Sequence, residues 1–195
     1  MSFVELFAAF LLALHLPVPL YWLMVHPFIG FWQRHGNAAF WVAGLFSWGL
    51  IVSVLYTFRQ GLLDASSAPR AAVAAGFVLV AFDVYLIVRA EMALGLRRLI
   101  GKAELEGRGE LVTSGIFSRV RHPRYTGMFL SVLGACLMAG TLALWVVALL
   151  WWLLSLLFIL FEERELRARF GPAYADYARR VPRFLPFRFF PRADN

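Results

Sequence analysis

Two short charged segments hold the residue types that could do chemistry in this chain: Arg121-His122-Pro123, and forty residues later Glu162-Glu163. Pro123 can be the first residue of a helix, which places Arg121 and His122 at that helix's N-terminus, where anions are favoured. The two glutamates come where a long apolar run ends, and an ionisable group at membrane depth is costly enough to indicate function. We therefore expect the active site where these two segments meet.

The run between the two segments must bring them together. No charged residue occurs from Met128 to Phe161. A membrane-spanning helix needs about 20 apolar residues, so the run is too long for one span and fits two, with Gly140-Thr141 as the turn. A tight hairpin returns the chain to the membrane surface that it left, so His122 and Glu162 are expected at the same surface.

The composition is that of a membrane protein. Of the 195 residues, 61% are hydrophobic, and the mean hydropathy is +0.70, which is too apolar for a soluble domain of this length. We expect an all-α, polytopic membrane helical bundle of about five spans, with a C-terminal interfacial helix. Residues 1–195 are expected to form one membrane domain, in which 1–96 make three spans and 97–187 make a polar loop, the hairpin and the tail.

The first three spans are expected at residues 3–25, 38–58 and 71–96. Pro17 and Pro19 remove backbone donors and predict a kink or a break in the first span. The polar run 33–37 is expected to be a turn between the first two spans. Arg89, near the end of the third span, could pair with Asp83 or Glu91 inside the bundle.

The charge distribution indicates a membrane surface rather than a nucleic acid. The net charge is +7, and fifteen of the nineteen basic residues lie in segments 97–124 and 164–192, beside apolar spans. This pattern is typical of cytoplasmic loops and of contact with anionic headgroups. With five spans, the N-terminus is expected outside, and 97–124 and the C-terminus inside. All basic residues but one are arginine, so we expect a bacterial inner membrane. No Cys/His cluster has metal-ligand spacing, so no metal site is expected.

The candidate residues also have simpler explanations. Glu162-Glu163 could be a solvated helix end, and Arg121-His122 could be a basic anchor beside the membrane. Tyr125, Tyr174 and Tyr177 could be interfacial anchors, although the last two are three residues apart and share a helix face. Each motif alone is therefore weak.

Taken together, the motifs resemble the isoprenylcysteine carboxyl methyltransferase and phospholipid methyltransferase superfamily. They are Leu111-Val112-Thr113-Ser114-Gly115-Ile116-Phe117, Arg121-His122-Pro123-Arg124-Tyr125-Thr126-Gly127, Glu162-Glu163-x-x-Leu166, Phe170-Gly171-x-x-Tyr174-x-x-Tyr177 and Val181-Pro182-Arg183-x-Leu185-Pro186. The resemblance covers about residues 105–187. Its specificity comes from the order of the motifs and from the hairpin between them.

The resemblance implies a membrane enzyme that uses S-adenosylmethionine, enclosed by the last two spans and the tail on the cytosolic side. The methyl acceptor would be a lipophilic molecule that arrives from the bilayer. The resemblance implies that the loop, hairpin and tail of 97–187 bind the cofactor. By the same resemblance, the catalytic residues would be Glu162, Glu163 and Arg121, and the cofactor-binding residues would be Gly115, His122, Tyr125, Glu162, Tyr174, Tyr177 and Arg183.

The acceptor stays open at this point. Members of the family that methylate a prenylcysteine carboxylate resemble one another in having a basic residue in the last span, and residues 151–161 here carry no charge. That substrate is therefore in doubt unless Arg89, Arg97 or Arg98 supplies the charge. A phospholipid amine or another small lipophilic nucleophile fits the sequence as well.

Two other functions compete with a methyltransferase. NADPH-dependent sterol reductases resemble the same Arg-His-Pro-x-Tyr-x-Gly and terminal Val-Pro pattern, but they replace the glutamate pair by a different charged series. Glu162-Glu163 therefore favours the methyl donor over NADPH. A non-catalytic membrane scaffold would explain the arginines but not the combined spacing of tyrosines, glycines and glutamates.

Overall fold

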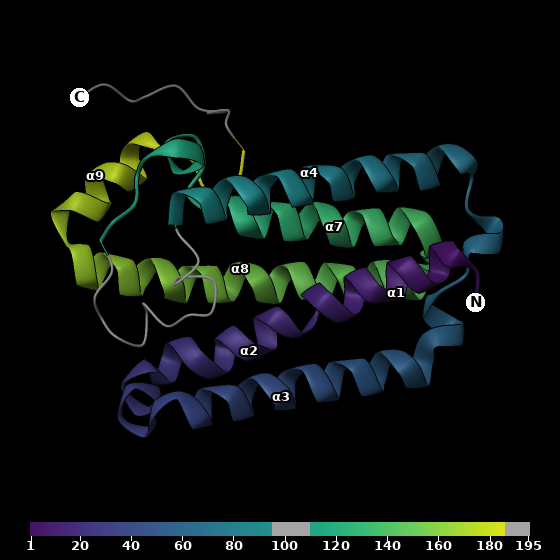
Figure 1. Cartoon of the computed structure of the whole chain (residues 1–195), viewed down its shortest axis with the longest axis horizontal. Coiled ribbons are helices and arrows are strands. Elements are labelled where there is room, and N and C mark those ends of the chain that lie inside the picture. The colour runs from purple at the N-terminus through teal and green to yellow at the C-terminus, as the bar shows by residue number, and fades with distance from the viewer. Residues whose placement is uncertain (95–109, 186–195) are drawn as a thin grey trace.

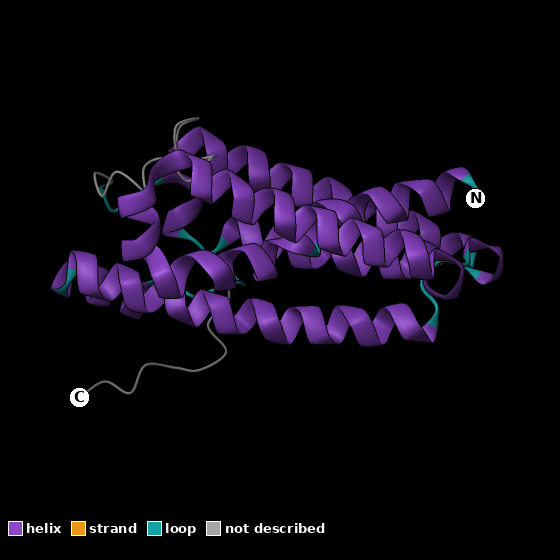
Figure 2. Ribbon diagram, turned by 90° about the horizontal axis from the view of Figure 1, so that it is seen from below, coloured by secondary structure: helices purple, strands orange, loops and turns teal. Residues whose placement is uncertain are grey.

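The computed structural model describes residues 1–94 and 110–185, and these residues form a bundle of long helices without any strand (Figures 1 and 2). The helices are α1 (Phe3–His15), α2 (Pro17–Val25), α3 (Ile29–Leu62), α4 (Arg70–Leu94), α7 (Pro123–Ala139), α8 (Leu142–Phe170) and α9 (Pro172–Arg180), with short 3-10 turns η1 (His26–Phe28), η2 (Ala65–Ser67) and η3 (Gly115–Ser118). The all-α prediction is confirmed. Most of the polar loop expected from residue 97 lies outside the described residues.

Four helical segments in the described part of the chain are long and apolar enough to cross a membrane: Phe3–Val25, Trp41–Leu62, Arg70–Leu94 and Leu142–Phe170. Helix α7 has 17 residues and rises about 26 Å, which is at the lower limit for a span. The expected fifth span therefore stays a prediction.

The first apolar segment is broken into α1 and α2 at Leu16, where the prolines predicted a break. The His15 carbonyl would normally accept a hydrogen bond from the backbone N–H of residue 19, but Pro19 has none. The indole Nε1 of Trp151 on α8 donates to this carbonyl instead, at 3.1 Å. The break is thus stabilised by a neighbouring helix, as buried membrane segments require.

The expected turn at residues 33–37 is wrong, because α3 runs without interruption from Ile29 to Leu62. The run contains no proline, and a single glycine inside a helix costs only about 1 kcal/mol. Polar residues alone therefore do not end this helix. The link between the first and second spans is the shorter turn η1, His26–Phe28.

Helices α4 and α7 lie side by side along most of their length (Figure 1). A Cβ added to Gly76 on α4 would lie 2.8 Å from the Gly134 carbonyl oxygen on α7, and the reverse substitution meets the Gly76 carbonyl at the same distance. Small residues allow such a close approach of two helices in a membrane. Near the site end of this interface, the Nε2 of His15 on α1 lies 3.3 Å from the Oδ2 of Asp83 on α4.

A two-residue turn joins α7 to α8, and the last turn of α3 holds it in place. Helix α7 ends at Ala139, and Thr141 caps α8 by accepting a hydrogen bond from the Leu144 N–H at 3.3 Å. The Thr141 hydroxyl donates to the Gly61 carbonyl at 2.9 Å. Because α7 and α8 run antiparallel, the start of α7 and the charged end of α8 lie at the same end of the bundle (Figure 1).

The charged residues after Phe161 stay in helix, since α8 continues to Phe170. Gly171 ends α8 with a φ of 54°, a conformation that side-chain-bearing residues rarely adopt. The chain then folds back as α9, whose Tyr174 and Tyr177 are buried against the end of α8 and the 111–117 segment. This fold places α9 and the tail, residues 181–185, over the end of the α7–α8 hairpin where α7 begins and α8 ends.

Candidate active site

Glu163 is the centre of the largest ion cluster in the described residues. Its side chain has no exposed surface, and a carboxylate without water requires several charged or polar partners. Arg183 provides a bidentate contact, with Nε 3.0 Å from Oε1 and Nη2 2.8 Å from Oε2. Arg121 donates its Nη2 to Oε1 at 2.8 Å, and Arg167 donates to Oε2 at 3.4 Å. The His122 Nε2 lies 3.2 Å from Oε1.

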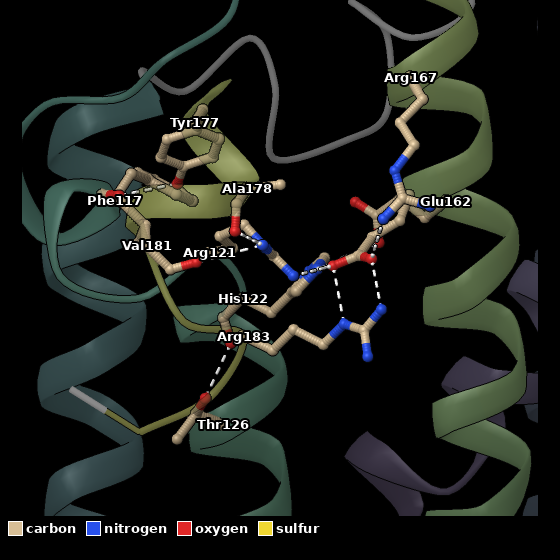
Figure 3. A network of polar contacts seen from close by, with 11 residues as sticks. Phe117, Arg121, His122, Thr126, Glu162, Arg167, Tyr177, Ala178, Val181 and Arg183 are labelled. Carbon is tan, nitrogen blue, oxygen red and sulfur yellow. Dashed lines mark hydrogen bonds and ion pairs between the residues drawn. The ribbon is translucent and has the colours of Figure 1, made fainter. Parts of the chain in front are cut away.

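The same arginines connect three elements that are distant in sequence. Figure 3 shows Arg121 and Arg183 reaching towards α8 from the start of α7 and from the tail. The other Arg121 nitrogen, Nη1, donates to the carbonyls of Ala178 and Val181 at 2.6 and 3.1 Å. Glu163 therefore ties both the N-terminal end of α7 and the tail to α8.

Backbone hydrogen bonds hold the tail in the same place. The N–H groups of Arg121 and His122 donate to the carbonyls of Pro182 and Arg183, at 2.8 and 3.0 Å. These donors are available because Pro123 is the first residue of α7 and the two residues before it are outside the helix. One turn into α7, the Thr126 hydroxyl also contacts the Phe184 carbonyl at 3.2 Å.

Glu162 faces a different environment from its neighbour. Adjacent side chains on a helix point about 100° apart, and Glu162 lines a cavity between the start of α7, the end of α8 and α9. Its Oε2 lies 4.0 Å from the His122 Nδ1. His122 thus lies between the two glutamates, with one ring nitrogen near each carboxylate.

Three of the residues that line this cavity each have a buried polar atom without a hydrogen-bond partner within the described ranges: Glu162 Oε2, Arg121 Nε and the Tyr174 hydroxyl. They comprise an acceptor, a donor and a group that can be either. Buried polar groups are normally paired, so unpaired groups that share a cavity indicate a place for a polar ligand.

Aromatic rings cover the polar part of the cavity. The Tyr174 and Tyr177 rings meet edge to face with centroids 6.0 Å apart, and the His122 and Tyr125 rings stack at 5.6 Å. The Tyr177 hydroxyl donates to the Phe117 carbonyl at 2.7 Å, which fixes α9 on η3. Burial raises the pKa of Tyr177 to about 12, although the Arg121 charge opposes the shift. Burial also raises the pKa of Tyr174.

The cavity has an apolar side as well. Trp22 of α2 and Leu94 at the end of α4 contribute to its lining. Neither residue was expected at the site, because nothing in the sequence links the first span to the hairpin. These two residues come from α2 and α4, whereas the charged lining residues Arg121, His122 and Glu162 come from the start of α7 and from α8.

The residues proposed from the sequence fall into three places. Six line the cavity: Arg121, His122, Tyr125, Glu162, Tyr174 and Tyr177. Glu163 and Arg183 form the ion cluster behind it. Gly115 adopts a φ of 61° and lines a second cavity. Arg167 was not proposed, although its position four residues after Glu163 on one helix could have indicated the pair.

The ion pairs considered for Arg89 are not those in the structure. Asp83 pairs with His15, and Glu91 pairs with Arg124, Nε to Oε1 3.2 Å. Within residues 1–94 and 110–185, Arg89 has no acidic partner. The expectation was wrong because spacing along one helix cannot identify partners on other helices.

Comparisons with known proteins agree with the motifs. The model of the phospholipid methyltransferase family matches residues 71–173, just over half of the chain. Protein-S-isoprenylcysteine O-methyltransferase B of Arabidopsis thaliana is 33% identical over 87 residues, which are 44% of this chain and 44% of that protein. Protein-S-isoprenylcysteine O-methyltransferase of Schizosaccharomyces pombe is 36% identical over 77 residues, 39% of this chain and 33% of that protein.

A relative with a different description is also similar. The cobalt-zinc-cadmium resistance protein CzcN of Cupriavidus metallidurans is 44% identical over 77 residues, 39% of this chain and 35% of that protein. The matches thus span less than half the length of these relatives. No solved structure matches the chain.

Proposed function

This chain belongs to the phospholipid methyltransferase family, and on that premise we propose that it transfers a methyl group from S-adenosylmethionine to a lipophilic acceptor at the membrane surface. The observation that carries the proposal is the set of three unpaired polar atoms on one cavity: Glu162 Oε2, Arg121 Nε and the Tyr174 hydroxyl. A ligand that carries an ammonium, a carboxylate and hydroxyls at once would satisfy all three.

The lining residues fit the parts of this cofactor. The Glu162 carboxylate suits the ammonium group or the ribose hydroxyls, and Arg121 Nε with His122 suits the carboxylate of the amino-acid tail. The rings of Tyr125, Tyr174 and Tyr177 offer faces for the adenine and for the sulfonium cation. We assign these residues to cofactor binding. Glu163 and Arg183 would act as positioning residues. The Glu163 carboxylate contacts both Arg183 and Arg121, and neither Glu163 nor Arg183 lines the cavity.

When bound, S-adenosylmethionine supplies an electrophilic methyl group on a sulfonium ion. The chain's own contribution would be alignment and exclusion of water, because an in-line displacement needs no proton transfer at the reacting carbon. Helix α9 covers the polar side of the cavity, and the ion cluster of Glu163 holds α9 and the tail there. The acceptor would approach along the apolar side, past Trp22 and Leu94.

The acceptor class that we propose is a lipophilic nucleophile: a prenylcysteine-like carboxylate, a phospholipid amine or another small molecule. Among the three arginines considered as partners of an acceptor carboxylate, Arg89 lines the second cavity. Arg97 and Arg98 lie outside the described residues. Arg124 lines the candidate site itself, but its Nε already pairs with Glu91 Oε1 at 3.2 Å.

We further propose one membrane domain in a bacterial inner membrane, with the N-terminus outside and the site end in the cytoplasm. Helices α1 and α2 make one crossing, and α3, α4, α7 and α8 make one each. The site end carries the arginine-rich segments around Arg121 and Arg167, which is the distribution typical of the cytoplasmic side.

Calorimetric titration of the detergent-purified protein with S-adenosylhomocysteine, and in parallel with NADPH, tests the proposal. We expect saturable binding of the first ligand, at least tenfold weaker in Glu162→Gln and unchanged in Glu165→Gln, which changes another acid of α8 that does not line the cavity. Binding of NADPH alone would move the assignment to a membrane reductase. Folded protein that binds neither ligand would favour a scaffold.

A further inference from the structure

A second cavity lies next to the candidate site and shares the same chain segment, residues 115–126. Phe117 and residues 121–125 line the candidate site, whereas Arg119 and Thr126 line the second cavity. No described residue lines both. The second cavity is therefore a separate space.

One face of α4 forms the main wall of this cavity. Its lining includes Phe82, Tyr85, Leu86 and Arg89, which follow the i, i+3, i+4, i+7 spacing of a single helix face. Phe82 and Tyr85 are more than half exposed, at 55% and 53%. Ile116 of η3 and the tail residues Phe184 and Leu185 add further apolar surface. This wall covers about two turns of α4, and its apolar side chains end in the cation of Arg89.

Two arginines lie on the lining without a partner. Arg89 and Arg119 are exposed, and neither side chain makes an ion pair or a hydrogen bond within the described residues. The acids nearest to Arg89 on its own helix are already engaged, Asp83 by His15 and Glu91 by Arg124. Among residues 1–94 and 110–185, no acid therefore competes with an external anion for the two guanidinium groups.

Arg89 lies near the end of a helix that is long and apolar enough to span a membrane. It is five residues before Leu94, the last residue of α4, and five residues rise about 8 Å. An arginine at this distance from the end of a spanning helix can extend its guanidinium to the membrane interface while its methylenes cover apolar surface. The apolar residues Phe82 and Tyr85 lie deeper, towards the middle of the same helix.

From this arrangement we propose that the second cavity binds an anionic phospholipid of the surrounding bilayer. The lipid phosphate would lie between Arg89 and Arg119, and an acyl chain would lie along Phe82 and Tyr85. Charge complementarity selects an anionic headgroup, and the exposed apolar face below the arginines selects a lipid over a free phosphate. The proposal does not depend on the reaction that the neighbouring site performs.

The test is a binding measurement on the full chain, purified in a neutral detergent. Native mass spectrometry during titration with phosphatidylglycerol or with phosphatidylcholine gives the number of bound lipids and their apparent affinity. The variants are Arg89→Gln and Arg119→Gln. Arg70→Gln is the matched control. Arg70 is an exposed arginine at the opposite end of α4, and its substitution removes the same charge.

We expect one phosphatidylglycerol to bind more tightly than the rest and more tightly than phosphatidylcholine. Each cavity variant should weaken this site about fivefold, and the double variant about 25-fold, while Arg70→Gln leaves it unchanged. Equal losses of lipid affinity in Arg89→Gln, Arg119→Gln and Arg70→Gln would show general attraction to a basic surface and would overturn the proposal. Unchanged binding in the two cavity variants would overturn it as well. Displacement of the lipid by glycerol phosphate at equal concentration would also contradict it, because the apolar wall would then contribute nothing.

Discussion

The guanidinium of Arg183 holds both oxygens of the Glu163 carboxylate, with Nε 3.0 Å from Oε1 and Nη2 2.8 Å from Oε2. Twenty residues and the reversal at Gly171 separate the two partners. The contact closes the tail over the end of α8, and Arg121 joins the same carboxylate from the start of α7. The cavity walls therefore depend on one buried acid that does not itself line the cavity.

Glu163→Gln should destabilise the bundle. The substitution leaves three guanidinium groups around a neutral amide, and removing one member of a buried ion cluster costs about 3–5 kcal/mol. We expect a lower melting temperature in detergent and weaker binding of S-adenosylhomocysteine together. Arg183→Ala should cost less, because its side chain is 42% exposed. Arg164→Ala, an exposed residue on the same helix, is the control; equal stability of Glu163→Gln and Arg164→Ala would contradict the role of the cluster.

Glu162→Gln should weaken ligand binding without lowering the stability of the fold. Its carboxylate lines the cavity and has an unpaired buried oxygen, so the folded state gains little from its charge. Loss of one hydrogen bond to a charged group is worth about 1.5–3 kcal/mol, which corresponds to roughly tenfold to a hundredfold in affinity for S-adenosylhomocysteine. The melting temperature without ligand should stay within about 2 °C of the wild type. A variant that melts much earlier but binds normally would assign Glu162 to the fold instead.

The sequence predicts the local parts of this site and not its long-range contacts. The break beside Pro17 and the turn at Gly140-Thr141 follow from backbone chemistry that a few neighbouring residues determine. The proximity of His122 and Glu162 follows from the length of the apolar run between them.

Other features depend on which side chains meet across helices, and spacing does not encode that. The different surroundings of Glu162 and Glu163 follow from the rotation of α8 against α7 and α9. The pairing of Asp83 with His15 joins the first and third spans, and no pattern in either span indicates it. Helix α3 continues through the polar residues 33–37 because polar side chains alone do not break a helix that contains no proline.

Gly134→Ala should separate α4 from α7. The new Cβ would lie 2.8 Å from the Gly76 carbonyl oxygen, so the two backbones must move apart, at a cost of about 1–3 kcal/mol for an overpacked interior. Gly49→Ala on α3 is the control, since nothing lies within 4 Å of its added Cβ, and alanine favours the helix. Melting curves in detergent should show a loss for the first variant and none for the second. Equal curves would mean that the α4–α7 contact is not tight.

The Tyr177 hydroxyl should make stability depend on alkaline pH. Its folded pKa of about 12 lies above the usual value of 10.0, so the folded state keeps a proton that the unfolded state releases between these values. The contribution is therefore complete below about pH 10 and is lost as the pH rises to about 12. Tyr177→Phe removes this titration along with the hydrogen bond to Phe117. We expect the stability advantage of the wild type over Tyr177→Phe to shrink as the pH rises from about 10 to about 12; a constant difference in melting temperature would contradict a buried, neutral phenol.

Ser66 and Ser118 should lie on opposite sides of the membrane. Ser66 is in the connection between α3 and α4, at the end of the bundle where the α7–α8 turn contacts α3, whereas Ser118 ends η3 beside the cavity. Both are exposed, and the single native cysteine, Cys136, is buried. In intact cells, a membrane-impermeant maleimide should therefore label Ser66→Cys, and it should label Ser118→Cys only after the cells are opened. Labelling of Ser118→Cys from outside and of Ser66→Cys from inside would invert the orientation. Labelling of both from one side would contradict a single membrane crossing by α4, the candidate span between them.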